Sequence, residues 1–289
     1  MPRTPSANAD AMSLNVHLKR LHLQSPQPAA VAAFYARAYG MALRTDGGVW
    51  ECCAAGSELH VSGGQAQQLH YALFGCADPA DWQALLHRTR QLERADLSAF
   101  AGLHPQAIGL RDPEGNCLVF EPPAVAVASA EPHPHRLPGA MTQHFALRTQ
   151  KIEAMRDFYS QSLGFDLSDT VHDDAGALRA CFVRGNPMHH TLALFGAPVA
   201  GFDHQSFETP DWDALKQWAD HMGRLRIEIV WGVGRHGPGN DVFFMVRDPD
   251  GNLAEISSEM ETCAPDRPAG RWKHEERTLN LWGKAILRS

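Results

Sequence analysis

Two histidines and one glutamate in the second half of the chain combine residue types that bind divalent metal ions. His144, His204 and Glu255 are separated by 60 and 51 residues, and each falls in a segment that we expect to be a β-strand. Two neutral imidazoles and one carboxylate on rigid strands could hold one face of an Fe(II) octahedron and leave adjacent positions open. Reactions of dioxygen need such open positions, whereas a tetrahedral site with four protein ligands would indicate structural zinc.

Each of these residues also has an ordinary structural explanation. A single histidine in a strand is commonly a hydrogen-bonded core or surface residue, and a glutamate near a hairpin is commonly exposed to water. Glu255 fits that alternative less well, because the run NLAEI surrounds it with apolar residues, where an unpaired carboxylate would be costly. The three residues together therefore favour a metal site.

The elements that must position these residues occur in a repeated order. The segments AFYARAYGM at 33–41 and DFYSQSLGF at 157–165 share a Phe-Tyr pair and a later Gly, at an offset of 124 residues. The segments IGLRDPEGNCLVFE at 108–121 and FMVRDPDGNLAEIS at 244–257 share an Asp-Pro-acid-Gly turn between apolar runs, at an offset of 136. Two copies of one design therefore follow each other along the chain.

The periodicity of apolar residues within the second copy predicts the order βαβββ twice. The expected strands, where apolar and polar residues alternate or apolar runs are short, are 143–149, 180–183, 191–195, 203–209, 226–231, 241–246 and 252–256. The expected helices, where apolar residues recur at helical spacing, are 151–163 and 212–222. The first half fits the same scheme, with strands at 15–24 and 69–74 and helices at 29–39 and 79–90.

We therefore predict an α+β fold of four βαβββ units, paired into two tandem domains. The predicted domains are residues 1–125 and 142–262, joined by a linker at 126–141 and followed by a C-terminal tail at 263–289. The linker assignment depends on three prolines and a lack of periodicity. The tail mixes apolar and charged residues, which favours packing onto its own domain, with a lid or an intersubunit contact as the alternative.

The four units, the RDPDG turns and the FY-x(4)-G helix ends resemble the vicinal oxygen chelate superfamily, specifically its type I extradiol catechol dioxygenases. These are two-domain enzymes of the catechol 2,3-dioxygenase and dihydroxybiphenyl dioxygenase kind. The resemblance covers the chain from about Leu14 to the last expected strand. It implies that each domain is an incomplete mixed β-barrel with helices outside. It also implies an iron site formed by His144, His204 and Glu255, with Mn(II) as the alternative ion.

The first half offers an internal comparison. By the two offsets, Arg20 corresponds to His144 and Val119 corresponds to Glu255, and only His70 sits where a ligand could be. An arginine, one histidine and a valine do not make a metal site. The resemblance implies the same asymmetry, since the first domain of these dioxygenases is generally free of metal.

The resemblance assigns further active-site roles. In NPMHHTLALF the second histidine, His190, matches the acid-base residue, and an imidazole suits that role because it can take and return a proton near neutral pH. His236 and Asn240, in VGRHGPGND, are expected beside the substrate, with a surface loop position as the alternative for His236. Met245 stands where the resembled enzymes usually have a tyrosine, or Phe244 does if the hairpin register shifts by one residue.

The activity implied by the resemblance is Fe(II)-dependent insertion of O2 into a catechol-type substrate, as in the catabolism of aromatic hydrocarbons. Two other functions stay open. A metal-dependent isomerase or lyase of the glyoxalase type would use the same triad without oxygen, and the missing tyrosine keeps this alternative open. A non-catalytic protein that binds a small molecule would be expected to lack the metal ligands, which this chain has.

Composition narrows the partners and the compartment. The net charge is −7, from 26 basic and 33 acidic residues, and the basic residues are scattered, which disfavours nucleic-acid binding. The sequence shows no apolar run approaching a membrane span and no apolar core of a signal peptide near its start, so we expect neither membrane insertion nor secretion. The six cysteines form no CxxC pair and indicate reduced thiols in the cytoplasm. The resemblance adds the expectation of a homo-oligomer.

Overall fold

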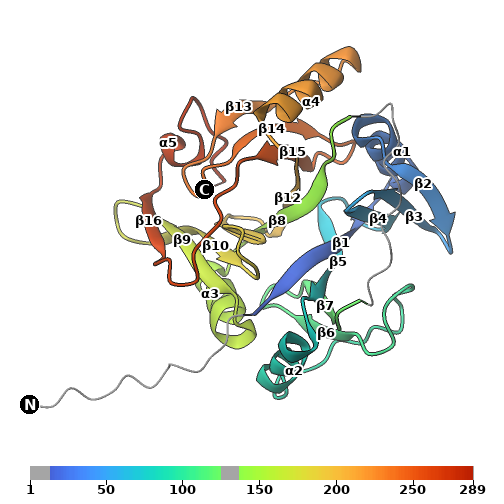
Figure 1. Ribbon diagram of the computed structural model, residues 1–289, viewed down its shortest axis with the longest axis vertical. Coiled ribbons are helices and arrows are strands. Elements are labelled where there is room, and N and C mark those ends of the chain that lie inside the picture. Colours follow the sequence, from blue (N-terminus) through green and yellow to red (C-terminus); the bar gives the residue numbers. More distant parts are fainter. Residues whose placement is uncertain (1–13, 125–136, 289) are drawn as a thin grey trace, which may run out of the picture.

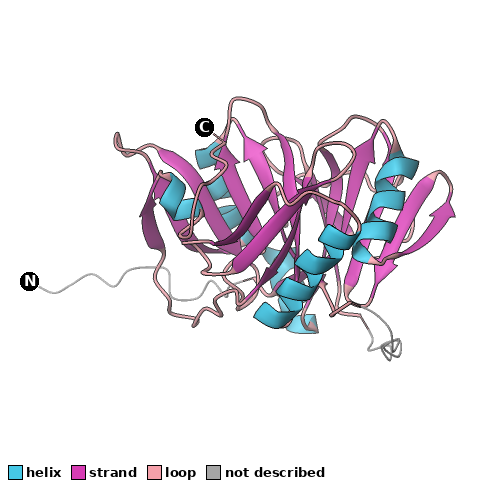
Figure 2. Ribbon diagram, turned by 90° about the horizontal axis from the view of Figure 1, so that it is seen from above, coloured by secondary structure: helices cyan, strands magenta, loops and turns pink. Residues whose placement is uncertain are grey.

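The fold is α+β, as predicted, and it contains more β-strand than helix (Figure 1, Figure 2). A computed structural model describes residues 14–124 and 137–288. Its strands form two open, mixed sheets, one from each half of the chain, and neither sheet closes into a barrel within the described residues. This agrees with the expectation of two incomplete barrels.

The first half forms a sheet of seven strands and two helices. Its helices are α1 (Pro28–Tyr39) and α2 (Pro79–Arg88). Its strands are β1 (Val16–Ser25), β2 (Ala42–Asp46), β3 (Val49–Ala54), β4 (Ser57–Gly63), β5 (Gln68–Cys76), β6 (Ile108–Arg111) and β7 (Cys117–Glu121). They are ordered β2-β3-β4-β1-β5-β7-β6 in the sheet.

The second half forms a sheet of nine strands, ordered β13-β14-β15-β12-β8-β11-β10-β9-β16. The helices are α3 (Ile152–Asp157), its π-helical continuation η1 (Phe158–Leu163), α4 (Trp212–Arg224) and α5 (Glu276–Leu279). The strands are β8 (Met141–Thr149), β9 (Asp166–His172), β10 (Leu178–Arg184), β11 (Leu192–Gly196), β12 (Gly201–Glu208), β13 (Trp231–Arg235), β14 (Val242–Arg247), β15 (Leu253–Ser258) and β16 (Gly270–Lys273).

Three of the four predicted units have the full βαβββ order, and the second does not. After α2, only β6 and β7 follow in the described chain. The residues between α2 and β6 instead turn back over the sheet, and Leu97, Phe100 and Leu103 pack against Tyr71 and its neighbours. These apolar side chains are partly buried without forming a strand, which is why this unit is one strand short.

A second correction concerns the strand expected at 226–231. The chain there still completes the end of α4, because Arg226 has a positive φ of 55° and the amide of Ile227 donates to the carbonyl of Met222. Amides used in this way cannot join a sheet ladder. The strand β13 therefore begins only at Trp231.

The repeated sequence motifs meet each other across the two halves. The Tyr35 hydroxyl of the first FY pair lies 3.4 Å from Asp248 Oδ2 in the second RDPDG turn. Reciprocally, the Tyr159 hydroxyl donates to Asp112 Oδ2 in the first turn at 3.1 Å. One continuous hydrophobic core contains buried residues of both sheets and of the helices between them. The repeats therefore specify how the halves pack as well as how each half folds.

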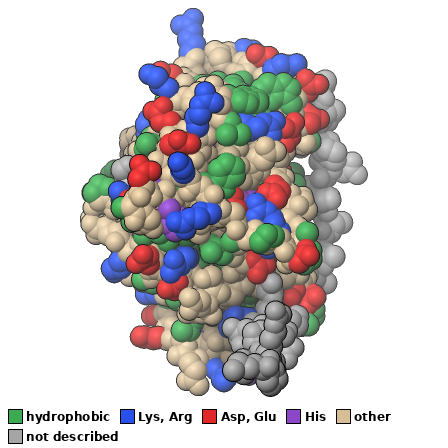
Figure 3. All heavy atoms as spheres, turned by 90° about the vertical axis from the view of Figure 1, so that its left-hand side faces the viewer, with side chains coloured by type: hydrophobic (Ala, Val, Ile, Leu, Met, Phe, Trp, Pro, Cys, Tyr) green, Lys and Arg blue, Asp and Glu red, His purple; other side chains and the backbone are tan. Residues whose placement is uncertain are grey.

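The tail packs back onto its own half, as the favoured prediction stated. Strand β16 pairs in parallel with β9, and α5 follows it. Most of the predicted linker, residues 126–136, lies outside the described residues. No helix among the described residues is long and apolar enough to cross a bilayer. On the face shown in Figure 3, acidic and basic side chains are intermixed rather than gathered by sign.

Candidate metal centre and pocket

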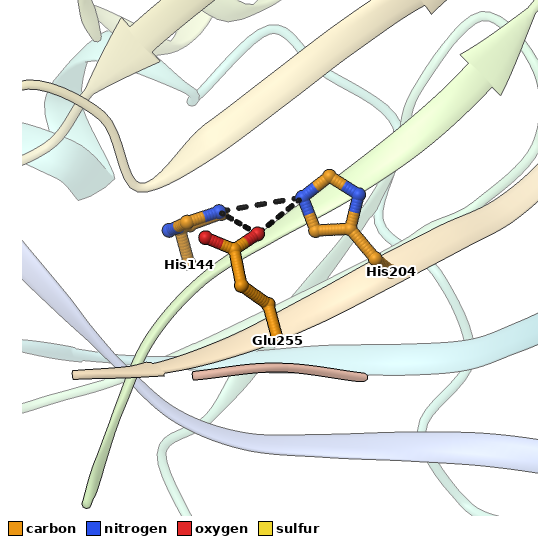
Figure 4. A group of neighbouring side chains, drawn as sticks. All are labelled: His144, His204 and Glu255. Carbon is orange, nitrogen blue, oxygen red and sulfur yellow. Dashed lines mark hydrogen bonds and ion pairs between the residues drawn. The ribbon is translucent and has the colours of Figure 1, made fainter. Parts of the chain in front are cut away.

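Three neighbouring strands bring His144, His204 and Glu255 together (Figure 4). Strand β12 lies between β8 and β15, and its Ser206 is paired with His144 on one side and with Glu255 on the other. His204, two residues before Ser206, faces the same side of the sheet. Because neighbouring strands are about 4.8 Å apart, the long side chains of His144 and Glu255 can converge over the small Ser206.

The three side chains present their ligand atoms to a common point. His144 Nε2 and His204 Nε2 are 3.4 Å apart, and they lie 3.9 Å and 3.7 Å from Glu255 Oε2. Ligand atoms that bind one ion at about 2.1 Å can be separated by at most about 4.2 Å. All three separations satisfy this limit, so one metal ion fits between the atoms.

The charge distribution in this cluster also favours the binding of a cation. Glu255 is fully buried, and neither of its carboxylate oxygens has a hydrogen-bond partner. Burial, with a further contribution from Asp241, raises the pKa of Glu255 well above its usual value. Burial lowers the pKa of His144 and of His204, which keeps both imidazoles neutral and able to bind metal. A divalent cation would compensate the buried carboxylate.

A β-bulge precedes each ligand histidine. In the pairing of β8 with β12, Gln143 and Asp203 are the residues left without a register partner. A bulge re-aims its side chains, so each of these residues reaches the ring of the histidine that follows it. His144 Nδ1 contacts Gln143 Oε1 at 3.0 Å, and His204 Nδ1 contacts Asp203 Oδ1 at 2.7 Å. With Nδ1–H donated in this way, Nε2 of each imidazole is left for the metal.

The cluster borders a pocket beside the second sheet. The residues that line this pocket are mainly aromatic and aliphatic. They are His144, Phe182, His190, Ala193, Phe195, His204, Trp231, His236, Pro238, Met245, Leu279 and Arg288. An apolar pocket with a few polar groups at one end is typical of a small-molecule site.

His190 lies in this pocket beside the triad. It is buried, and its ring centre is 4.2 Å from that of His144. His190 Nδ1 is 3.1 Å from Nδ1 of His189, whose Nε2 lies 3.2 Å from Asp169 Oδ2. His189 and Asp169 do not line the pocket, so the chain of contacts runs from the site into the protein interior.

The structure brings two of the three predicted substrate-binding residues to the pocket. His236 stacks on Phe243, donates from Nδ1 to the carbonyl of Leu279, and places Nε2 3.9 Å from Glu255 Oε1. Met245 is buried in the pocket wall and is paired with Glu255 in the hairpin, whereas Phe244 faces the core. Asn240 is exposed at a turn with a φ of 57° and does not line the pocket.

Sequence reasoning missed the contribution of the tail to this site. Leu279 and Arg288 both line the pocket. The Arg288 guanidinium lies 4.6 Å from the ring centre of Phe195 and pairs with Asp203, the residue beside His204. The sequence pattern of an amphiphilic segment does not indicate which residue its arginine will contact. Asp203 was missed because regular alternation would point it away from the face that His204 occupies.

The first half has the same bulged strands, but its described residues form no metal site. In the pairing of β1 with β5, Lys19 and His70 are unpaired, so Arg20 and Tyr71 take the places of His144 and His204. His70 therefore corresponds to Asp203, and the expectation that it sits at a ligand position is wrong. Arg20 donates from Nη1 to the Tyr71 hydroxyl at 3.2 Å and from Nε to Glu58 Oε1 at 2.7 Å.

Comparison with known proteins shows similarity over the part of the chain that carries the triad. Residues 142–256, which contain the whole triad, match the model of the Glyoxalase/Bleomycin resistance protein/Dioxygenase superfamily. Metapyrocatechase 2 of Cupriavidus necator is 31% identical over 145 residues. The aligned segment covers 50% of this chain and 44% of that enzyme, so this chain spans less than half of the length of that relative.

Two solved structures cover nearly all of the chain. An extradiol ring-cleaving dioxygenase of Brevibacterium fuscum matches with a TM-score of 0.79 and 23% identity, over 96% of this chain and 82% of that chain. An Mn(II)-bound glyoxalase from Novosphingobium aromaticivorans matches with a TM-score of 0.76 and 22% identity, over 96% and 93% of the two chains. At these identities the comparisons establish the fold.

Proposed function

Because residues 142–256 match the model of this superfamily, we propose that the protein is an Fe(II)-dependent extradiol dioxygenase, which inserts O2 into a catechol-type aromatic substrate. The convergence of His144, His204 and Glu255 at the end of an apolar pocket carries the proposal. Two histidines and one carboxylate on one face of an ion, with the other positions open, are typical of non-haem Fe(II) oxygenases. The similarity to metapyrocatechase supports the choice of substrate class.

The chemistry that Fe(II) would supply here is Lewis-acid activation of a catechol and a binding position for O2. His190 is the acid-base residue in this proposal. Its Nδ1 is occupied by His189, so Nε2 is the nitrogen that accepts a hydroxyl proton from the substrate and later returns it. The aromatic side chains of Phe182, Phe195 and Trp231 exclude water and hold the substrate ring.

His236 and Met245 complete the proposed substrate site. The Leu279 carbonyl accepts from His236 Nδ1, which leaves Nε2 toward the triad as the nitrogen that contacts substrate oxygens. The thioether of Met245 offers no hydrogen-bond donor, so orientation of the substrate depends on His190 and His236. Asn240 was predicted to bind substrate, but its exposed position gives that role no support.

We also propose the finer assignments made from the sequence. These are iron rather than manganese, a metal-free first domain at 1–125, a metal-binding domain at 142–262, and a homo-oligomer in the cytoplasm that takes part in aromatic catabolism. Each of the six cysteines is free in the described structure, which supports a reducing compartment.

Oxygen uptake tests the main proposal. Protein loaded anaerobically with Fe(II) is mixed with a panel of catechols, while oxygen consumption and the yellow ring-opened product are followed. We expect both signals in the wild type and neither in a His204→Ala variant. A His87→Ala variant serves as the control, because His87 is an exposed histidine on α2, far along the chain from the triad. No oxygen uptake with any catechol would contradict the dioxygenase proposal.

One observation supports a second candidate, a metal-dependent isomerase or lyase. Met245 leaves the pocket wall without a hydroxyl. Such an enzyme would turn over its substrate without O2. Metal-dependent turnover of a small oxygenated substrate under anaerobic conditions would favour this candidate.

A further inference from the structure

The carboxylate of Asp203 joins the C-terminal tail to the metal cluster. Its Oδ1 contacts His204 Nδ1 at 2.7 Å, so it touches the ring whose Nε2 faces Glu255. The Arg288 guanidinium binds the same carboxylate through two bonds, Nη2 to Oδ1 at 2.7 Å and Nε to Oδ2 at 3.1 Å. Asp203 and the Arg288 side chain are both almost fully buried.

Further contacts with the sheet and within the tail hold Arg288 in this place. The guanidinium lies 4.6 Å from the ring centre of Phe195 and 5.1 Å from that of Trp231, both of which line the pocket. Its Nη1 donates to the carbonyl of Ile286 at 2.6 Å, and the Trp231 indole donates to the carbonyl of Lys284 at 3.0 Å. Both cation–π contact and bidentate pairing favour one orientation of the arginine.

The two ligand histidines therefore differ in what supports them. His144 Nδ1 is paired with the neutral amide of Gln143, whereas His204 Nδ1 is paired with a carboxylate. A carboxylate partner fixes the ring and increases the electron density that the imidazole offers to a metal. Asp203 can do this only while its own orientation is fixed and its buried charge is balanced. Arg288 fixes the orientation through two hydrogen bonds and is the nearest cation, and Arg148 Nε is a second cation 3.8 Å from Oδ2.

We propose that Arg288 is a positioning residue for the metal site, acting through Asp203 on the ligand His204. This inference rests on the metal site of the proposed function. Three of the five N–H groups of Arg288 are already used, at Nε and Nη2 by Asp203 and at Nη1 by a backbone carbonyl, so the protein itself fixes the orientation of this guanidinium. The tail is therefore part of the metal centre, although it supplies none of its three ligands.

The proposal is tested by metal affinity, measured without any catechol. Mn(II) and Co(II) are titrated into the chelator-treated full chain, and the Co(II) absorption spectrum reports the ligand field. We expect Arg288→Ala and Asp203→Asn each to weaken binding 10- to 100-fold, the range seen when outer partners of metal ligands are lost. Arg288→Lys keeps the charge but not the bidentate geometry, so its affinity should be intermediate. Arg277→Ala, an exposed arginine of the same tail, should bind like the wild type.

A double-mutant comparison separates a positioning role from general damage. The losses in the free energy of metal binding caused by Arg288→Ala and Asp203→Asn should not add, because both variants break the same chain of contacts. The losses caused by Arg288→Ala and Gln143→Ala should add, because these variants act on different histidines. Wild-type affinity and an unchanged Co(II) spectrum in Arg288→Ala or Arg288→Lys would overturn the inference, as would full additivity with Asp203→Asn. If the variants change metal affinity as expected but the wild type turns over no catechol, the result would count against the dioxygenase proposal only.

Discussion

Replacing Glu255 by glutamine should stabilise the metal-free protein and abolish its stabilisation by metal. The wild-type carboxyl is fully buried with no hydrogen bond to either oxygen, and burial raises its pKa well above the ordinary value. Without metal, the native protein therefore binds this proton more tightly than the unfolded chain does. For a raised acid pKa the sign is fixed: stability is full below the unfolded pKa and falls as pH rises toward the native pKa.

The size of this effect follows from the pH interval. One pH unit corresponds to about 1.4 kcal/mol, and roughly 2.5 units separate pH 7 from the ordinary glutamate pKa, so the raised native pKa lowers the stability of the metal-free wild type by up to about 3 kcal/mol at pH 7. Glutamine has a similar shape and does not ionise, so Glu255→Gln should recover most of this. With metal at about 100 times its Kd, the wild type should gain about 3 kcal/mol and the variant almost nothing.

Urea unfolding followed by tryptophan fluorescence measures both effects, at pH 5 and pH 7, with chelator or with Mn(II). Glu259→Gln is the matched control, since Glu259 forms a partly exposed ion pair with Arg235 and its loss should cost less than about 1 kcal/mol. Burial also raises the pKa of Asp241, to about 7, which leaves a smaller pH dependence of the same sign in the variant. The reasoning is refuted if Glu255→Gln is no more stable than the wild type in chelator at pH 7, or if Mn(II) stabilises both equally.

Two further predictions concern the contact between the halves and the acid-base residue. Tyr159→Phe removes a buried hydrogen bond to Asp112, so it should lower the free energy of unfolding by about 1–3 kcal/mol in urea without changing Mn(II) affinity; an unchanged urea midpoint would contradict this. In Asp169→Asn, the new amide can donate to His189 Nε2, and the proton of the His189 ring then sits on Nδ1. His189 Nδ1 would donate to His190 Nδ1, so the proton of the neutral His190 ring would sit on Nε2, which could no longer accept one. Its kcat should fall at least tenfold at wild-type metal affinity, and an undiminished kcat would argue against His190 as the base.

The sequence predicts those parts of the site that regular elements position. His144, His204 and Glu255 were found because each falls in a strand of a repeated unit, where alternation decides the facing of a side chain. Arg288 and Asp203 could not be found in this way. A bulge in β12 places Asp203 on the face of its neighbour, and the path of the tail depends on contacts that have no period.

The errors in the predicted fold have a related cause. Residues 226–231 have the apolar pattern of a strand, but hydrogen bonding of Ile227 to the end of α4 takes precedence over that pattern. In the second unit, a loop rather than a strand packs Phe100 against the sheet. Periodicity reports which side chains are buried, and tertiary contacts decide which backbone conformation buries them.

Comparison of the halves shows that the backbone alone does not create the metal site. Both sheets have a bulge before the corresponding residues of their two central strands. In the first half, however, Arg20 supplies a fixed cation where a metal would lie, and it is already paired with Glu58 and Tyr71. Phe100 also covers that face, whereas the corresponding face of the second half keeps an open pocket. A carboxylate added at Val119 would therefore meet Arg20 rather than an ion. Conversion of the first half would require removal of the arginine and of the covering loop, because each closes the site independently.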